Sequence, residues 1–247
     1  MFNIWTIARR EYKAYFGSPV AYIVAFLILA VVGGLFTASI FFTMQAMGQV
    51  PPPGVQVVTG TLMFVLVFAS PALTMRLLSE EQRLGTMELL LTAPVRDYEL
   101  VVGKWLGAFL FVLTIIALTI FYPLVLNTLV DPGIDQGILI SGYLGVFLIS
   151  GAFLAIGVAV SSLFTNQVAS FLGTFGVLIF FWWIFAILAQ VGGGTTAEVM
   201  RYLDFSGKFY ENLIQGLVEL SDVVYILCVT ALALLLGSVS VEMRRWR

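Results

Sequence analysis

Histidine, cysteine and charged residues are the scarce components of this sequence. Its 247 residues include no histidine and a single cysteine, Cys228. Without histidine the chain lacks the commonest metal ligand and general base of proteins, and one cysteine allows neither an internal disulfide nor a cysteine-rich metal site. Only 11% of the residues are charged, against about 25% in a soluble domain. This scarcity excludes a water-soluble enzyme, and the net charge of −2 argues against a nucleic-acid partner.

What the sequence has in abundance is apolar residues. Hydrophobic residues make up 60% of the chain, and the mean hydropathy is +1.03. A soluble fold of this size could not hide that much apolar area beneath so few charged side chains. The composition therefore predicts an integral membrane protein.

Charged residues are missing from four long stretches, at 14–75, 105–130, 136–197 and 223–241. A helix that crosses the hydrocarbon core needs about 20 apolar residues, so the first and third stretches each have room for two helices. The proline-rich segment 48–54 and the polar segment 161–167 supply the turns between them. The predicted fold is an all-α membrane domain covering residues 1–247. Its six spans are expected at about 19–44, 57–78, 105–129, 138–162, 168–191 and 222–241.

The distribution of the basic residues predicts the orientation of the chain. Of the 12 Lys and Arg residues, all but Arg201 and Lys208 lie at the termini or in the loop between spans 2 and 3. Cytoplasmic loops carry the excess of Lys and Arg, so both termini are expected to face the cytoplasm from the cytoplasmic (plasma) membrane. No predicted span has an ionisable residue near its middle, which argues against a proton-coupled transporter.

The N-terminal segment 2–16 is amphipathic. On a helical period one largely aromatic face holds Trp5, Ala8, Tyr12, Tyr15 and Phe16, and another face holds the basic residues Arg9, Arg10 and Lys13. This pattern predicts a helix that lies in the membrane interface. The alternative is an ordinary positive N-terminal anchor.

The loop at 79–95 carries the most informative pattern of the chain. Ser79 is expected to cap a short helix, Gly85 to allow a partner to approach the backbone, and Pro94 to end the helix. Leu84, with Met87, Leu90 and Leu91, gives this helix an apolar face. The pattern predicts a cytoplasmic helix that transmits the movement of a partner, and the alternative is a loop whose apolar face rests on the membrane. The sequence contains no G-x-x-x-x-G-K-[ST] phosphate loop, so energy from ATP would have to come from another subunit.

Two motifs carry a family resemblance. The pattern Glu80-Glu81-x-x-x-Gly85-Thr86-x-Glu88-x-Leu90-Leu91-x-x-Pro94-Val95, followed by Gly103-Lys104, resembles the loop signature of ABC-2 type permeases. These are the membrane subunits of one class of ATP-binding-cassette transporters. Residues 203–225 are similar to the outer segment of the gliding-motility-associated branch of these permeases. One departure is Gly207, which follows Ser206 where the branch commonly has proline.

The resemblance implies six transmembrane helices and three further helical elements. The first is an elbow helix at 2–16 with Trp5, Arg9, Arg10, Tyr12 and Lys13. The second is a coupling helix that docks on an ATPase, with Glu80, Glu81, Arg83, Gly85, Thr86, Glu88, Leu90, Leu91 and Pro94. The third is a re-entrant or interfacial element at about 196–220, followed by span 6, with Phe209, Glu211, Gly216, Asp222 and Tyr225 as its candidate residues. For this third element a structural or gating role is preferred to direct contact with substrate.

The resemblance also implies partners. The permease would pair with a second permease subunit, identical or different, and with ABC-type ATPase subunits in the lipid bilayer. An auxiliary extracytoplasmic subunit is a further candidate partner. The chain itself would be non-catalytic and hold no cofactor, because ATP and Mg²⁺ bind to the ATPase. The alternatives are a channel or secondary transporter that needs no ATPase, and a membrane scaffold that transports nothing.

Overall fold

The protein is almost wholly helical. The computed structural model describes residues 2–46, 52–85, 95–130 and 133–245, and these ranges contain no strand. The first helices are α1 (Phe2–Phe16), α2 (Pro19–Gln45), α3 (Gln56–Thr74), α4 (Ser79–Arg83), α6 (Asp97–Thr119) and α7 (Phe121–Leu129). Then follow α8 (Gln136–Leu163), α9 (Gln167–Ile179), the π-helix η1 (Phe180–Ile184), α10 (Phe185–Val191) and α11 (Thr195–Leu203). The last are α12 (Phe205–Gly207), the π-helix η2 (Lys208–Asn212), the 3₁₀ turn η3 (Leu213–Gln215) and α13 (Leu220–Arg245).

Six helical segments within the described residues are long and apolar enough to cross a membrane, as the charge-free stretches predict. They are Pro19–Gln45, Gln56–Arg83, Asp97–Leu129, Gln136–Leu163, Gln167–Val191 and Leu220–Met243. The third begins well before the expected residue 105. Arg96 is its N-cap, and the Glu99 carboxylate accepts a hydrogen bond from the Arg96 backbone N–H. A capping arrangement of this kind starts a helix among polar residues, so the apolar run underestimates its length.

The turns between spans are set by local capping. Ser18 is the N-cap of α2 and Pro19 is its first residue, a position at which proline is favoured. The carboxylate of Asp135 accepts hydrogen bonds from two backbone N–H groups at the start of α8, and the Asn166 side chain accepts one from Val168 at the start of α9. The predicted break at 161–167 is therefore confirmed.

Helix α8 occupies the centre of the bundle. Most of its residues are buried, whereas most residues of α2, α9–α10 and α13 are exposed or only partly buried. Gly157 of α8 lies so close to α3 that a Cβ there would be 2.7 Å from the Cβ of Thr74. Small residues allow such close approaches between membrane helices, so Gly157 lets α8 pack closely on α3.

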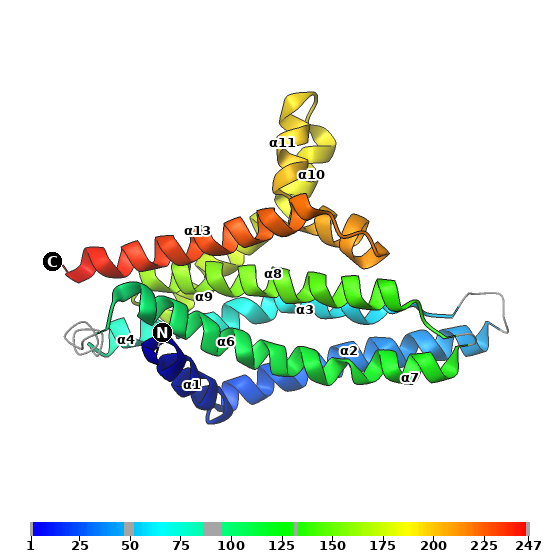
Figure 1. The fold of residues 1–247 in the computed structure, drawn as a ribbon, viewed down its shortest axis with the longest axis horizontal. Helices are drawn as coiled ribbons and strands as arrows, with labels where there is room; N and C mark the ends of the chain where they lie inside the picture. The colour runs from blue at the N-terminus through cyan, green and yellow to red at the C-terminus, as the bar shows by residue number, and fades with distance from the viewer. Residues whose placement is uncertain (1, 47–51, 86–94, 131–132, 246–247) are drawn as a thin grey trace.

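The helices form an elongated bundle with its two ends clearly distinguished (Figure 1). The N-terminus, the C-terminus and α4 lie at one end, here called the termini end. Helix α7 and the end of α2 lie at the opposite end. Helices α10 and α11 form a hairpin that stands out from the side of the bundle, joined through a turn in which Gly194 has a φ of 60°. Only glycine adopts this conformation readily.

The three additional helical elements fall on described helices to different extents. Helix α1 covers the predicted elbow segment 2–16, and α11 to η3 supply the helical segment expected at about 196–220. Only α4 and the turn at 84–85 represent the predicted coupling helix. Its remaining candidates, namely Thr86, Glu88, Leu90, Leu91 and Pro94, lie outside the described residues.

Candidate functional site

The start of the predicted coupling loop is fastened to the end of α8. The hydroxyl of buried Ser161 accepts hydrogen bonds from the backbone N–H groups of Leu78 and Ser79, each at 3.1 Å. The Gln82 side chain donates to the carbonyl of Ser162 at 2.9 Å. Unpaired N–H groups at a helix start need acceptors, and here a different span supplies one. The loop is thereby attached directly to a span in the centre of the bundle.

The expected capping role of Ser79 is wrong. The N-cap of α4 is Leu78, and Ser79 is the first helical residue. The Ser79 hydroxyl donates back to the carbonyl of Met75, one turn earlier. A serine hydroxyl that bonds the preceding turn is an alternative to capping, and Ser161 takes over the capping role.

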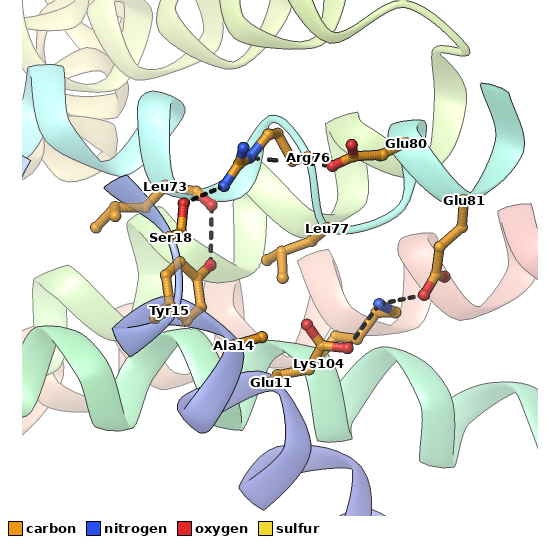
Figure 2. Close-up of a pocket in the computed structure, with 10 residues that line it drawn as sticks. All are labelled: Glu11, Ala14, Tyr15, Ser18, Leu73, Arg76, Leu77, Glu80, Glu81 and Lys104. Atoms are coloured by element: carbon orange, nitrogen blue, oxygen red, sulfur yellow. Dashed lines mark hydrogen bonds and ion pairs between the residues drawn. The ribbon is translucent and has the colours of Figure 1, made fainter. Parts of the chain in front are cut away.

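A buried lysine joins three elements at this position (Figure 2). The Nζ of Lys104, on α6, lies 2.7 Å from Oε1 of Glu81 on α4 and 3.0 Å from Oε1 of Glu11 on α1. Lys104 is only 2% exposed. Arg10 lies 3.0 Å from the same oxygen of Glu11 and 3.8 Å from Glu81. We call Arg10, Glu11, Glu81 and Lys104 the Lys104 cluster.

The cations of the Lys104 cluster stabilise the charged form of Glu11. Burial by itself would raise the pKa of this carboxyl. The positive charges of Lys104 and Arg10, with the hydrogen bonds that both donate, outweigh burial and hold the pKa of Glu11 below its ordinary value of 4.5. Glu11 is therefore ionised at neutral pH, and the contact between α1 and α6 includes a charged pair.

A cavity of about 240 Å³ adjoins the Lys104 cluster, between α1, the end of α3 and α4. On its far side Arg76 donates to the Ser18 hydroxyl at 2.6 Å and lies 4.0 Å from Glu80. The Tyr15 hydroxyl donates to the carbonyl of Leu73 at 2.8 Å. These contacts tie the turn between α1 and α2 to the end of α3 (Figure 2). The Lys104 cluster and these contacts together fasten α1 to α3, α4 and α6, and we call this arrangement the joint.

The predicted coupling residues divide into buried and exposed groups. Glu81 belongs to the Lys104 cluster, and Glu80 lies 4.0 Å from both Arg76 and Arg83. Leu84 is 61% exposed. Gly85 has a φ of 70°, and a Cβ added there would meet no atom of the described residues within 4 Å. The charged start of the loop thus faces the bundle, whereas Arg83, Leu84 and Gly85 are exposed.

Helix α1 lies unusually close to α6. A Cβ on Gly103 would be 2.8 Å from the Cβ of Ile7, and one on Gly107 would be 2.6 Å from the Cβ of Glu11. Glycines four residues apart allow this approach. The close packing puts Glu11 beside Lys104.

The predicted elbow residues do not act as two simple faces. Trp5, Arg9 and Lys13 are exposed, while the hydroxyl of half-buried Tyr12 lies 3.1 Å from that of Thr114. Arg10 is exposed but belongs to the Lys104 cluster. The expected aromatic face is wrong in one respect: its members Ala8 and Tyr15 are buried within the protein, and Trp5 is not. Helix α1 uses part of its apolar surface for packing on the bundle.

A second buried ion pair lies in the predicted outer segment. The Nζ of Lys208 lies 2.7 Å from Oδ1 of Asp222, and Asn212 donates to Oδ2 of the same carboxylate at 2.7 Å. Lys208 also lies over the rings of Tyr202 and Tyr225, 4.6 and 4.9 Å from their centroids. The pair fastens η2 to the start of α13. Of the predicted residues, Asp222 and Tyr225 meet here.

The other predicted outer residues have separate positions. Phe209 is fully buried and lies 6.1 Å from Trp182 of η1, centroid to centroid. Gly216 has a φ of 93° and ends the η3 turn. Glu211 is exposed on a 300 Å³ cavity. Two π-helical segments therefore meet through aromatic rings, and such segments are frequent at functional sites.

Gly207, the departure from the branch motif, has a local explanation. The Asp204 carboxylate accepts hydrogen bonds from the backbone N–H groups of Ser206 and Gly207, at 2.8 and 2.9 Å. Proline has no backbone N–H, so it could not form the second of these bonds. The glycine keeps one of the two capping hydrogen bonds, which a proline would remove.

Sequence reasoning missed Glu11, Lys104, Lys208 and Asn212 as members of these ion-pair clusters. The available signals were weak. Lys104 immediately precedes a charge-free stretch, and Lys208 is one of two cations on the predicted outer side. A charge at such a position has to find a partner when it is buried. The sequence does not say which partner.

Comparison with known families agrees with the helical architecture. A family model described as ABC-2 family transporter protein matches residues 5–243, which covers all six candidate spans. No curated protein matches the chain closely enough to count as a relative. Because the family model covers nearly the whole sequence, the chain belongs to the ABC-2 family of transporter proteins and is a multi-pass membrane permease component.

Proposed function

We propose that this chain is the permease subunit of an ATP-binding-cassette transporter that moves an as yet unidentified substrate across the cytoplasmic membrane. A separate ATPase subunit binds ATP and Mg²⁺ and hydrolyses the nucleotide. The permease has no catalytic residue and no cofactor of its own. Both termini and the coupling loop face the cytoplasm, in keeping with the positive-inside rule and with their common position at the termini end (Figure 1).

One observation carries this proposal: the coupling loop is attached to three other elements. Lys104 connects it to α6 and, through Glu11, to α1, and Ser161 connects it to α8. A push on α4 is therefore delivered to two membrane-crossing helices and to the elbow helix. Packed helices shift as units instead of deforming continuously. Movement of the ATPase can in this way change the packing of the spans.

The exposed part of the loop supplies the docking surface. Leu84 and Arg83 point outward at the end of the described loop, and Gly85 leaves the backbone open to a partner. An exposed leucine beside a cation is suited to an apolar notch with an acidic rim. Half-buried Glu81 holds the surface in place and does not itself contact the ATPase.

The permease works as a dimer. Most residues of helices α2, α9–α10 and α13 are exposed or only partly buried, and a second permease subunit would cover part of this surface while lipid covers the rest. The π-helical contact between Trp182 and Phe209 lies where α9 meets the outer segment, so this segment can open or close with the packing of span 5. Assignment to the gliding-motility-associated branch remains a prediction from residues 203–225.

The test is co-expression with an ABC-type ATPase encoded beside this chain. Leu84→Asp is expected to reduce co-purification of the ATPase about tenfold, because a charge would replace an apolar contact of the docking surface. Leu129→Asp is the matched control, since Leu129 is similarly exposed but lies at the end of α7, away from the loop. Undiminished co-purification of the Leu84 variant would refute the docking surface. Solute movement by the permease in liposomes without the ATPase would support a channel instead.

A further inference from the structure

An apolar groove runs between the elbow helix and α6. It has a volume of about 620 Å³, within the range of about 300–1,000 Å³ that is typical of small-molecule sites. On α6 it is lined by Leu110, Leu113 and Ala117. On α1 it is lined by Trp5 and Tyr12. These largely apolar walls are suited to bind a hydrocarbon chain.

The two hydroxyl groups that line the groove, those of Tyr12 and Thr114, already have hydrogen-bond partners. The hydroxyls of Tyr12 and Thr114 lie 3.1 Å apart, and the Thr114 hydroxyl also lies 3.0 Å from the carbonyl of Leu110, to which it can donate. These polar groups satisfy one another. These two hydroxyls therefore do not require water or a polar ligand as a partner.

Two cations line the same groove. Arg9 and Lys13 are one helical turn apart on α1, and both are exposed. Neither forms an ion pair with any carboxylate of the described ranges, in contrast to neighbouring Arg10, which pairs with Glu11. No acidic residue lines the groove. A ligand that matches the groove in charge and polarity has a negatively charged head and an apolar body.

We infer that this groove binds an anionic phospholipid from the leaflet that borders α1. An acyl chain lies on Leu110, Leu113 and Ala117, and the phosphate lies between Arg9 and Lys13. The aliphatic stems of Lys and Arg cover apolar surface while their charged heads reach a headgroup. Trp5 and Tyr12 have the amphipathic rings that favour the headgroup level.

The groove has no acidic lining residue, and this determines which class of lipid headgroup fits it. A zwitterionic lipid carries an ammonium group beside its phosphate, and in this groove that group would face two cations with no acid to pair with. Phosphatidylglycerol has no such conflict, because its glycerol headgroup is uncharged and the negative charge of its phosphate is left to the two cations. The groove is therefore expected to select phosphatidylglycerol over phosphatidylcholine.

The bound lipid lies beside the joint already described. Helix α1 carries Arg9 and Lys13 toward the groove and Glu11 toward Lys104. A lipid that fastens α1 against α6 also stabilises the Lys104 cluster. This inference does not rest on the proposed ATPase, because it concerns a contact between the permease and its membrane.

The test is native mass spectrometry of the full chain, titrated with phosphatidylglycerol or phosphatidylcholine. Arg9→Gln with Lys13→Gln is expected to weaken phosphatidylglycerol binding about fivefold for each cation removed. Ala117→Phe fills the groove at an exposed position and is expected to weaken binding without changing the charge. The matched control is Arg83→Gln with Arg96→Gln, which removes two exposed cations outside the groove.

A second readout separates lipid binding from folding. Phosphatidylglycerol is expected to raise the thermal midpoint of the wild type and of the control pair, but not that of the groove variants. With no lipid added, all the proteins should unfold at similar temperatures, since every altered side chain is exposed. Equal binding of the two lipids by the wild type would overturn the inference. So would an equal loss of binding in the control pair, or undiminished binding by Ala117→Phe.

Discussion

The Nζ of Lys104 lies 2.7 Å from Oε1 of Glu81, so a residue of the third span is paired with one of the predicted coupling loop. The same nitrogen lies 3.0 Å from Glu11 of the elbow helix. One buried cation thus serves two carboxylates from two other elements. Removal of that cation would leave both acids without their main partner, and the consequences can be measured.

Lys104→Met is expected to destabilise the protein strongly. A buried pair that loses one member leaves an uncompensated charge, which typically costs about 3 kcal/mol or more. The thermal midpoint in detergent should fall by roughly 5–10 °C. The control is Arg96→Met, which removes a cation with an exposed side chain from the same end of the bundle and should change the midpoint little. An equal loss in both variants would show that Lys104 has no special role.

Gly107→Leu tests the close approach of α1 to α6. A Cβ at this position would lie 2.6 Å from the Cβ of Glu11 and 2.9 Å from the carbonyl oxygen of Ala8. The elbow helix would have to move away, at a cost of about 1–3 kcal/mol. Cross-linking between cysteines introduced at Asn3 and Glu99, whose side chains are hydrogen-bonded at 3.1 Å, would report the displacement as a lower yield.

The matched control for this substitution is Gly34→Leu. Gly34 lies within α2, and a Cβ there would meet no atom within 4 Å. The yield of the cross-link should therefore stay at the wild-type level. A yield unchanged by Gly107→Leu as well would show that α1 does not need the glycine to reach its position.

The membrane-crossing helices could be read from the sequence because one physical signal dominates them. A run of about 20 apolar residues can hardly be anything but a span, and the described part of the chain has six such helices. The predicted positions of the helix ends were less accurate. Asp97 and Glu99 belong to the third span, and their polarity conceals this from any count of apolar residues. Capping, which depends on single hydrogen bonds, decides where the helix begins.

The candidate site was harder to predict for a different reason. Periodicity indicates which residues share a face of a helix, but it does not say what that face will touch. Glu11 and Glu81 meet at Lys104 only after three elements have packed together. The motif identified the loop, whereas the partners that hold the loop follow from tertiary structure. The same limit explains why Trp5 was grouped with buried Tyr15 and is in fact exposed.

The pKa of Glu11 predicts a dependence of stability on pH. Lys104 and Arg10 lower this pKa below 4.5 in the folded protein despite burial. The carboxylate therefore contributes stability that is fully present above the unfolded-state pKa and is lost as the pH falls through the folded-state pKa. Wild type should be more stable than Glu11→Gln at pH 7, and the difference should shrink progressively below about pH 4.5.

Thermal unfolding of both proteins from pH 7 to pH 3 measures this difference. The Glu211→Gln variant is a suitable control, because Glu211 is exposed and should show no such convergence with the wild type. A difference between wild type and Glu11→Gln that stayed constant across the range would mean that the charge of Glu11 does not stabilise the fold.

The outer ion pair allows a test in which a second substitution repairs the first. Asp222→Leu leaves Lys208 buried and unpaired, and removes the acceptor of Asn212. The expected loss is about 3 kcal/mol, visible in thermal unfolding followed by tryptophan fluorescence. Buried Trp182, 6.1 Å from Phe209 of η2, contributes to this signal. Adding Lys208→Met removes the uncompensated charge, so the double variant should recover part of the loss.

Glu219→Leu, at an exposed position in the same segment, should cost little. A double variant less stable than Asp222→Leu would show that Lys208 acts mainly through the rings of Tyr202 and Tyr225.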